Sequence, residues 1–168
     1  LTNCAKEIEN PNENQSAGIP FEIVASTADT KTVNDGMHTN WAEGDQINLF
    51  HAVTDATTYT NDKAFKVTDL EGGKFSGTLT GTLDPQEEYD WYAFYPYTSQ
   101  ISTPANKSTY VTVASKTNGV QTQNGNNSMA HIAGANYPMA GKAYATPAGS
   151  TPELEMNHAT SLLEVVVT

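Results

Sequence analysis

The chain contains no arginine and a single cysteine among its 168 residues. All 8 basic residues are therefore lysines, and with 19 acidic residues they give a formal net charge of -11 at pH 7. Nucleic acids and anionic membrane surfaces are bound largely through cationic side chains, so this charge argues against both as partners. Charged residues make up only 16% of the chain, and much of the rest is Thr, Asn, Ser and Gly. This composition is typical of an extracellular β protein.

Signatures of membrane spans and of catalytic or metal sites are also missing from the sequence. No apolar run approaches the roughly 20 residues that a transmembrane helix needs. The motifs H-E-x-x-H and G-x-S-x-G are absent, and so is a phosphate-binding glycine loop. No second cysteine is present to share a zinc ion with the histidines, which are His38, His51, His131 and His158. We therefore expect no catalytic residues, no metal and no cofactor, and a protein that is not an enzyme.

Two acidic features contain the residue types of a glycosidase or a calcium site, but their spacing does not give the geometry that such sites need. Glu87 and Glu88 could pose as the carboxylate pair of a glycosidase, but adjacent residues of a strand point to opposite faces. The stretches "NDG" (34–36) and "YTND" (59–62) could hold calcium, but they lack the spaced ligands of an EF-hand loop. We expect solvated charges at the two glutamates and no specific ion at the acidic stretches.

The single cysteine, Cys4, lies in the N-terminal sequence "LTNC". This sequence looks like the end of a bacterial lipoprotein signal, in which Leu stands three residues before the cysteine. Asn3 departs from the pattern, because Ala, Gly or Ser usually precedes the cysteine. The polar, acidic stretch that follows has almost nothing to bury, as expected of a flexible tether. We expect residues 1–19 to be a leader and tether with Cys4 as the lipidated residue, the alternative being an incidental thiol.

Apolar residues along the rest of the chain alternate mostly with a period of two, which predicts β-strands. Gly72-Gly73 reads as a tight turn, and the one place where the sequence allows a helical turn is 84–88, with Asp84 as its cap. Residues 117–136 read as a long exposed loop. The expected strands cover residues 21–25, 45–53, 59–69, 74–83, 89–97, 108–115 and 154–168.

The aromatic strand "YDWYAFYPY" (89–97) allows two interpretations. Alternation places Trp91, Ala93 and Tyr95 on one face and Tyr92 and Phe94 on the opposite face. An exposed row of aromatics could stack on sugar rings, whereas a buried row is ordinary core. We favour core for the row, which comprises Trp91, Tyr92, Tyr95 and Tyr97, with the strand ending at Pro96.

Short strands bounded by turns and without intervening helices predict an antiparallel β-sandwich over residues 20–168. The sequence stops at 165–168, "VVVT", inside an apolar strand pattern. Natural domains seldom end on an exposed apolar strand, so we expect a domain that is truncated before a C-terminal domain.

Five segments carry recognisable motifs in a fixed order. They are "TKTVNDGMHTNWAEGDQINLF" (30–50), "KFSGTLTG" (74–81), "WYAFYPY" (91–97), "GNNSMAHIAGANYPMAGKA" (125–143) and "LEMNHATSLLEVVVT" (154–168). The first contains T-K-T and W-x-x-G-D-x-I, the second F-x-G, the third a Tyr-Pro strand end, the fourth a P-M pair and the fifth S-L-L. Together these segments resemble the N-terminal domain of the fimbrillin-like lipoproteins of the Bacteroidetes.

The resemblance implies a transthyretin-like, antiparallel Greek-key β-sandwich. It also implies a lipid-anchored protein exposed on the cell outer membrane, and a stalk, anchor or tip subunit of a type V pilus (fimbrium). Its partners would be other pilus subunits, and it would touch the membrane only through the lipid. In the family, processing removes the first strand, and a terminal strand of a neighbouring subunit fills the groove by β-augmentation.

The strand that would be removed is "FEIVAST" (21–27). In the oral pilins of the family the cut follows an arginine, and this chain has none. Lys31 is the nearest basic residue after the strand, so it is the candidate processing site for a lysine-directed protease. Otherwise the protein is never processed and serves as an anchor or a tip.

Other classes of function stay open. The chain could be a surface lipoprotein that does not polymerise and that binds a glycan or a host ligand, which exposed aromatics on one face would support. It could also be a spacer domain with no ligand of its own.

Overall fold

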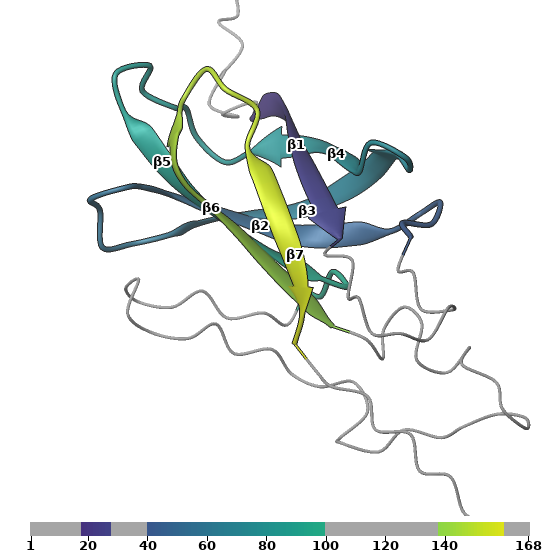
Figure 1. Cartoon of the computed structure of the whole chain (residues 1–168). Coiled ribbons are helices and arrows are strands. Elements are labelled where there is room, and N and C mark those ends of the chain that lie inside the picture. The colour runs from purple at the N-terminus through teal and green to yellow at the C-terminus, as the bar shows by residue number, and fades with distance from the viewer. Residues whose placement is uncertain (1–17, 28–39, 100–137, 160–168) are drawn as a thin grey trace, which may run out of the picture.

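The computed structural model describes residues 18–27, 40–99 and 138–159, which form seven β-strands and no helix (Figure 1). The strands are β1 (Ile19–Thr27), β2 (Gln46–Val53), β3 (Thr60–Asp69), β4 (Lys74–Leu79), β5 (Glu88–Tyr95), β6 (Met139–Pro147) and β7 (Glu153–His158). They form one sheet in the order β1-β4-β3-β2-β5-β6-β7, and the sheet closes into a barrel. Within these ranges no helix has the length and apolarity that spanning a membrane requires.

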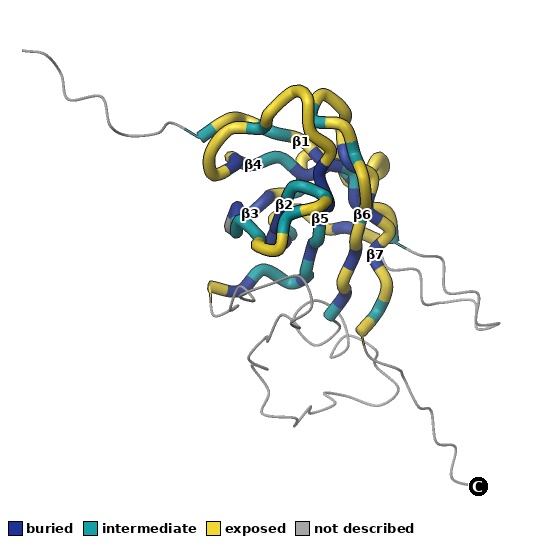
Figure 2. The backbone as a smooth tube through the Cα atoms, turned by 90° about the vertical axis from the view of Figure 1, so that its left-hand side faces the viewer, coloured by how far each residue is buried: buried dark blue, intermediate teal, exposed yellow. Residues whose placement is uncertain are grey.

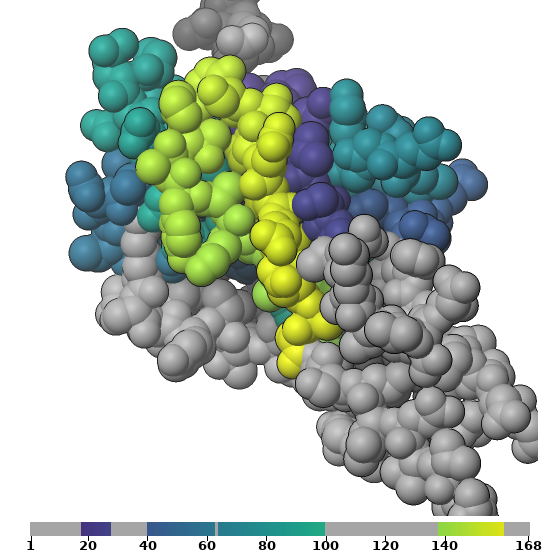
Figure 3. Space-filling model, in the orientation of Figure 1, coloured from purple at the N-terminus to yellow at the C-terminus, as the bar shows by residue number. Residues whose placement is uncertain are grey.

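The prediction of an all-β chain is confirmed, but the predicted transthyretin-like Greek-key sandwich is wrong. β1 pairs antiparallel with β4 from Ile19 to Val24 and parallel with β7 from Val24 to Thr27. One strand thereby joins the two ends of the sheet, and Figure 3 shows β1 lying between β7 and β4. Period-two alternation puts the same residues inside a sandwich or a barrel, so the pattern alone does not reveal the closure.

Most of the predicted strands that lie in the described ranges are present. β1 to β5 overlap the predictions at 21–25, 45–53, 59–69, 74–83 and 89–97, and β7 overlaps the start of the prediction at 154–168. β5 ends at Tyr95, directly before Pro96, as predicted. The predicted strand at 108–115 and loop at 117–136 lie outside the described residues.

The predicted helical turn at 84–88 is wrong. The Glu87 N–H donates to the Asp84 carbonyl over 3.1 Å, and the Asp84 carboxylate accepts from the Gln86 N–H over 2.9 Å. Asp84 thus caps a turn, as the sequence suggests, but the chain extends directly into β5 at Glu88. The turn makes no further helical hydrogen bond because Glu88 is already part of the sheet.

β6 was not predicted, since none of the expected strands covers residues 139–147. Its inward positions begin with Met139 and Gly141, so only one large apolar side chain marks the buried face. Gly141 must be small, because a Cβ there would meet the Met156 sulfur at 2.4 Å. The alternation that reveals β7, which Figure 2 shows as buried and exposed residues in turn, is therefore weak in β6.

The interior of the barrel is filled by the alternate residues of all seven strands. The predicted inward face of β5 is confirmed, since Trp91, Ala93 and Tyr95 are buried. Tyr92 and Tyr97 are only partly buried, so the prediction of core for the whole aromatic row is wrong at these two residues. The largest fully buried apolar side chains are Trp91, Phe65, Phe75, Ile23, Ile47, Leu49, Leu79, Met139, Leu154 and Met156.

Candidate functional site

The candidate site is the seam that β1 fills between β4 and β7. Along β4 the ladder runs from Ile19 opposite Leu79 to Val24 opposite Lys74. On the other side, the Val24 N–H donates to the Pro152 carbonyl over 2.9 Å before the parallel pairing with β7 begins. These are backbone hydrogen bonds, which any extended segment with suitable side chains can make.

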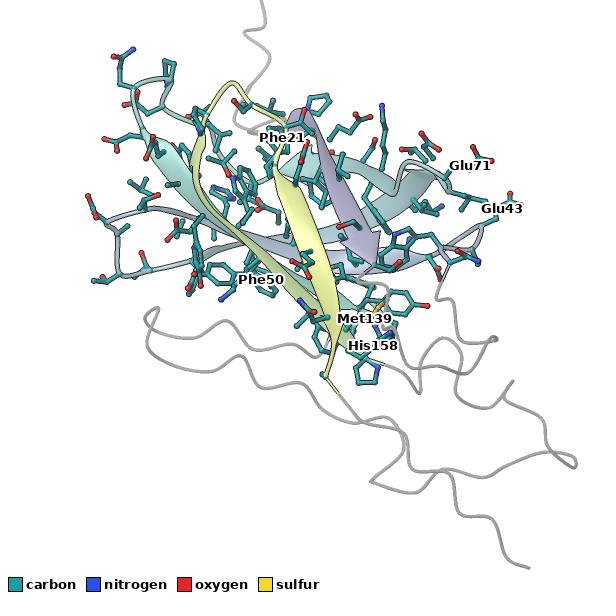
Figure 4. The ribbon with its side chains drawn as sticks, viewed as in Figure 1. Phe21, Glu43, Phe50, Glu71, Met139 and His158 are labelled. Atoms are coloured by element: carbon teal, nitrogen blue, oxygen red, sulfur yellow. The ribbon has the colours of Figure 1, made fainter. Side chains whose placement is uncertain are left out.

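The inward face of β1 supplies part of the core. Ile23 and Ala25, alternate residues of the expected strand 21–25, are both 0% exposed. Phe21, labelled on β1 in Figure 4, stacks on Trp91 with ring centroids 4.9 Å apart and an interplanar angle of 11°. Without β1, the interior of the barrel would therefore be open to water between β4 and β7.

The segment "WAEGD" (41–45) forms the turn into β2. Trp41 is buried, and the Asp45 carboxylate accepts from the Ala42 N–H over 2.8 Å. The second carboxylate oxygen of Asp45 accepts from the Tyr95 hydroxyl over 3.0 Å. This bond ties the turn to the aromatic strand, a link between two segments that sequence reasoning did not make.

Two tyrosines of β5 hold their protons more firmly than a free tyrosine. Burial, and then the hydrogen bond to Asp45, raises the pKa of Tyr95 well above its ordinary value of 10.0. Burial, and then contact with Tyr59 and Tyr144, raises the pKa of Tyr92 in the same direction. The two phenols therefore stay neutral in the folded protein at a pH where other tyrosines ionise.

Alkaline titration provides a test of this environment. Because the folded pKa values are raised, the stability that they contribute is complete below pH 10 and is lost as the pH rises further. We expect the tyrosinate absorbance of Tyr92 and Tyr95 to appear only together with unfolding. The double variant Tyr92→Phe and Tyr95→Phe should lose less stability in this range, and an unchanged alkaline profile would contradict the assignment.

A buried hydrogen-bonded pair, His51 and Asp62, lies inside the barrel. His51 Nδ1 and Asp62 Oδ2 are 2.5 Å apart, and both residues are buried. The second oxygen of Asp62 accepts from the Thr80 N–H over 2.8 Å. The His51 ring lies 5.3 Å from Trp91 and 5.8 Å from Tyr89, between centroids. Residues 59–62, which the sequence offers as a calcium candidate, thus contribute their aspartate to a histidine and a backbone amide.

A group of tyrosines lies on the outer face of β5 and β6. Tyr59 contacts Tyr92 edge to face at 4.9 Å, and Tyr92 contacts Tyr144 at 5.8 Å, between ring centroids. Tyr144 is 55% exposed, and Lys142 Nζ lies 5.0 Å from its ring centroid. We call these four residues the outer tyrosine cluster.

The remaining sequence candidates lie apart from these features. Glu87 and Glu88 are both exposed at the start of β5. Within the part of the chain that the structure describes, no three His, Cys, Asp or Glu side chains gather as metal ligands. Figure 4 shows His158 beside Met139, where β6 and β7 meet at one end of the barrel, and burial lowers the pKa of its imidazole.

Five candidates from the sequence lie outside the described residues. These are Cys4, Lys31, His38, His131 and the acidic stretch 34–36. Lipidation at Cys4 and processing at Lys31 therefore stay predictions.

Comparison with models of known protein families, with curated proteins and with solved structures finds no match to this chain. The function is therefore argued from the described residues and the sequence alone.

Proposed function

We propose that the protein is a surface-anchored pilus (fimbrial) or cell-adhesion subunit that assembles by β-strand exchange. The observation that carries the proposal is the place of β1, a single N-terminal strand that closes the barrel between β4 and β7. Its departure would open a groove along the core, and an extended strand of another subunit would restore the same hydrogen bonds.

Two features of the sequence support this proposal. Cys4 would carry the lipid that anchors the precursor to the outer membrane, and residues 5–19 would tether it. Lys31 follows β1, so a cut there would separate β1 from β2 to β7. The sandwich implied by the fimbrillin-like resemblance is not the fold observed, and so the proposal rests on β1 rather than on the family's fold.

Treatment with a lysine-specific protease tests the proposal. Full-length protein, expressed with a lipoprotein signal, is cut and then run unboiled on a denaturing gel. We expect a ladder of heat-labile multimers whose subunits begin at Thr32. The matched control is Lys31→Gln, which should stay monomeric under the same treatment. A monomer that keeps β1, or multimers in which every subunit keeps β1, would exclude exchange of this strand.

The outer tyrosine cluster supports a second candidate function, a surface lipoprotein that binds a glycan without polymerising. Tyr144 offers an exposed ring of the kind that stacks on sugars, and Tyr92 and Lys142 lie beside it. A glycan array probed with the intact protein should then give signals that Tyr144→Ala removes. Leu70→Ala, at another exposed apolar residue, is the control. If this variant loses the signal to the same extent as Tyr144→Ala, the outer tyrosine cluster is not the glycan-binding site.

A further inference from the structure

Both backbone polar groups of Ala25, near the end of β1, are hydrogen-bonded. The Ala25 N–H donates to the Gly73 carbonyl over 2.8 Å. The Ala25 carbonyl accepts from Trp41 Nε1 over 2.7 Å, in a buried hydrogen bond. Both backbone groups of one residue are thus held by Trp41 and Gly73, which we call the clasp.

The clasp exists because the β4 ladder ends one residue earlier. Val24 is the last residue of β1 that pairs with β4, opposite Lys74, and the chain before Lys74 turns away through Gly72-Gly73. The buried carbonyl of Ala25 therefore has no strand partner on that side, and the indole of Trp41 takes that place. In Figure 4, Glu43 and Glu71, from the two turns that provide the clasp, lie at the same end of the barrel.

The clasp is built to fit closely around the backbone. Gly73 has a φ of +61°, and a Cβ there would meet the Ala25 carbonyl oxygen at 2.5 Å. The Trp41 ring is held edge to face by Phe75 at 4.8 Å and by Tyr95 at 5.3 Å, between centroids. Neither partner can move away from the strand without disturbing the core.

We propose that the clasp selects which strand can occupy the β1 position, by requiring a small side chain where Ala25 now lies. The Ala25 side chain is 0% exposed, and the clasp fixes its backbone, so a larger residue cannot shift outward. Phe21 is only partly buried, and its end of the groove tolerates more variation. The selected pattern is an aromatic residue, an aliphatic or β-branched residue two positions later, and a small residue two positions after that. This inference rests on the proposed strand exchange and names its partner.

The partner is an extended segment of a second copy of this chain. Residues 110–116, "YVTVASK", have the required pattern and share V-A-S with residues 24–26 of β1. The C-terminal segment 162–168, "LLEVVVT", is also apolar but offers no small residue at the corresponding position. The clasp therefore favours the first segment over the second.

Peptide exchange tests this preference without requiring polymers to form. A protease site is inserted between Lys31 and Thr32 of the full chain, and the cut protein is kept as a two-piece complex. Fluorescent peptides then compete for the β1 position, and fluorescence polarisation measures their binding. We expect peptides 19–27 and 108–116 to bind within about tenfold of each other, and the Ala25→Leu peptide to bind at least about tenfold more weakly. Equal binding of the Ala25→Leu peptide, or stronger binding of 162–168 than of 108–116, would overturn the proposal.

Two variants separate the clasp from general packing. Trp41→Phe removes the N–H donor. It should speed the release of every bound peptide about tenfold, because the lost hydrogen bond is made to a backbone carbonyl that every peptide has. Tyr89→Phe is the control, since the Tyr89 hydroxyl accepts from the Asp84 N–H over 2.8 Å and takes no part in holding β1. Similar release from both variants would overturn the role of Trp41.

The uncut chain gives an independent measurement if no peptide exchanges. Failure of even the 19–27 peptide to exchange would count against the proposed strand exchange. The requirement of the clasp for a small residue at position 25 can still be tested in the uncut chain. Ala25→Leu should then lower the denaturation midpoint more than Phe21→Leu does. The reverse order would overturn the inference.

Discussion

Replacing Asp62 by alanine is expected to lower the free energy of unfolding by about 3–5 kcal/mol, because it breaks a buried pair at one partner. His51 would lose its carboxylate at 2.5 Å, and the Thr80 N–H would lose its acceptor at 2.8 Å. Both residues of the pair are buried, so water cannot replace the lost bonds without rearrangement of the barrel. Equilibrium unfolding in urea measures the change.

The conservative variant Asp62→Asn separates the two contributions of this carboxylate. An asparagine can keep the acceptor for the Thr80 N–H but lacks the negative charge beside His51. We therefore expect a smaller loss of stability than in Asp62→Ala. A loss below about 1 kcal/mol for Asp62→Ala would show that the pair is not buried as described.

Replacing Ile23 by alanine is expected to cost about 3 kcal/mol of unfolding free energy, within the range for deleting a buried aliphatic side chain. Ile23 is 0% exposed and lies at the centre of the inward face of β1. Thermal or urea unfolding of the full chain measures this cost.

The neighbouring residue provides the matched control. Glu22 points outward from the same strand, and its Oε1 lies 3.6 Å from Lys74 Nζ, with both side chains about half exposed. Exposed ion pairs contribute little, so Glu22→Gln should change stability by less than about 1 kcal/mol. Equal losses at Ile23 and Glu22 would show that β1 is not packed as the sealing strand.

The alternation of apolar residues was sufficient to predict the inward faces of β1 and β5. In β1 it selects Ile23 and Ala25, and in β5 it selects Trp91 and Tyr95, all of which are buried. The same signal failed at β6, because Gly141 occupies an inward position and offers no apolar side chain. Strand detection from sequence thus depends on residues that are large enough to form a pattern.

Closure of the barrel and the inner polar pair could not be predicted in the same way. Closure depends on parallel pairing of β1 with β7, two strands far apart in the sequence. The His51 pair depends on an irregularity in β3, where Leu49 lies opposite Lys63 and Phe50 opposite Asn61, so that Asp62 is the extra residue. A bulge redirects a side chain, and alternation carries no signal for it.

The clasp at Ala25 could not be predicted from the sequence either, because it depends on which segments lie side by side in the fold. Nothing in the sequence indicates that the Trp41 indole donates to the Ala25 carbonyl of β1. The glycine pair 72–73 is a sequence signal for a close backbone approach, but it was interpreted only as a tight turn. Gly73 in fact combines that turn with a close approach to Ala25.

A reversible disulfide across the β1 seam tests the central claim most directly. Glu22 lies opposite Ser76 in the antiparallel β1–β4 pair, and such Cα atoms are about 4.5–5.5 Å apart, which suits a disulfide. The variant Glu22→Cys with Ser76→Cys, made with Cys4→Ser, is cut at Lys31 in oxidised and reduced forms. Strand exchange predicts monomers while the disulfide is intact and heat-labile multimers after reduction. Multimers of the same length in both forms would show that β1 stays in place and that assembly, if it occurs, uses another surface.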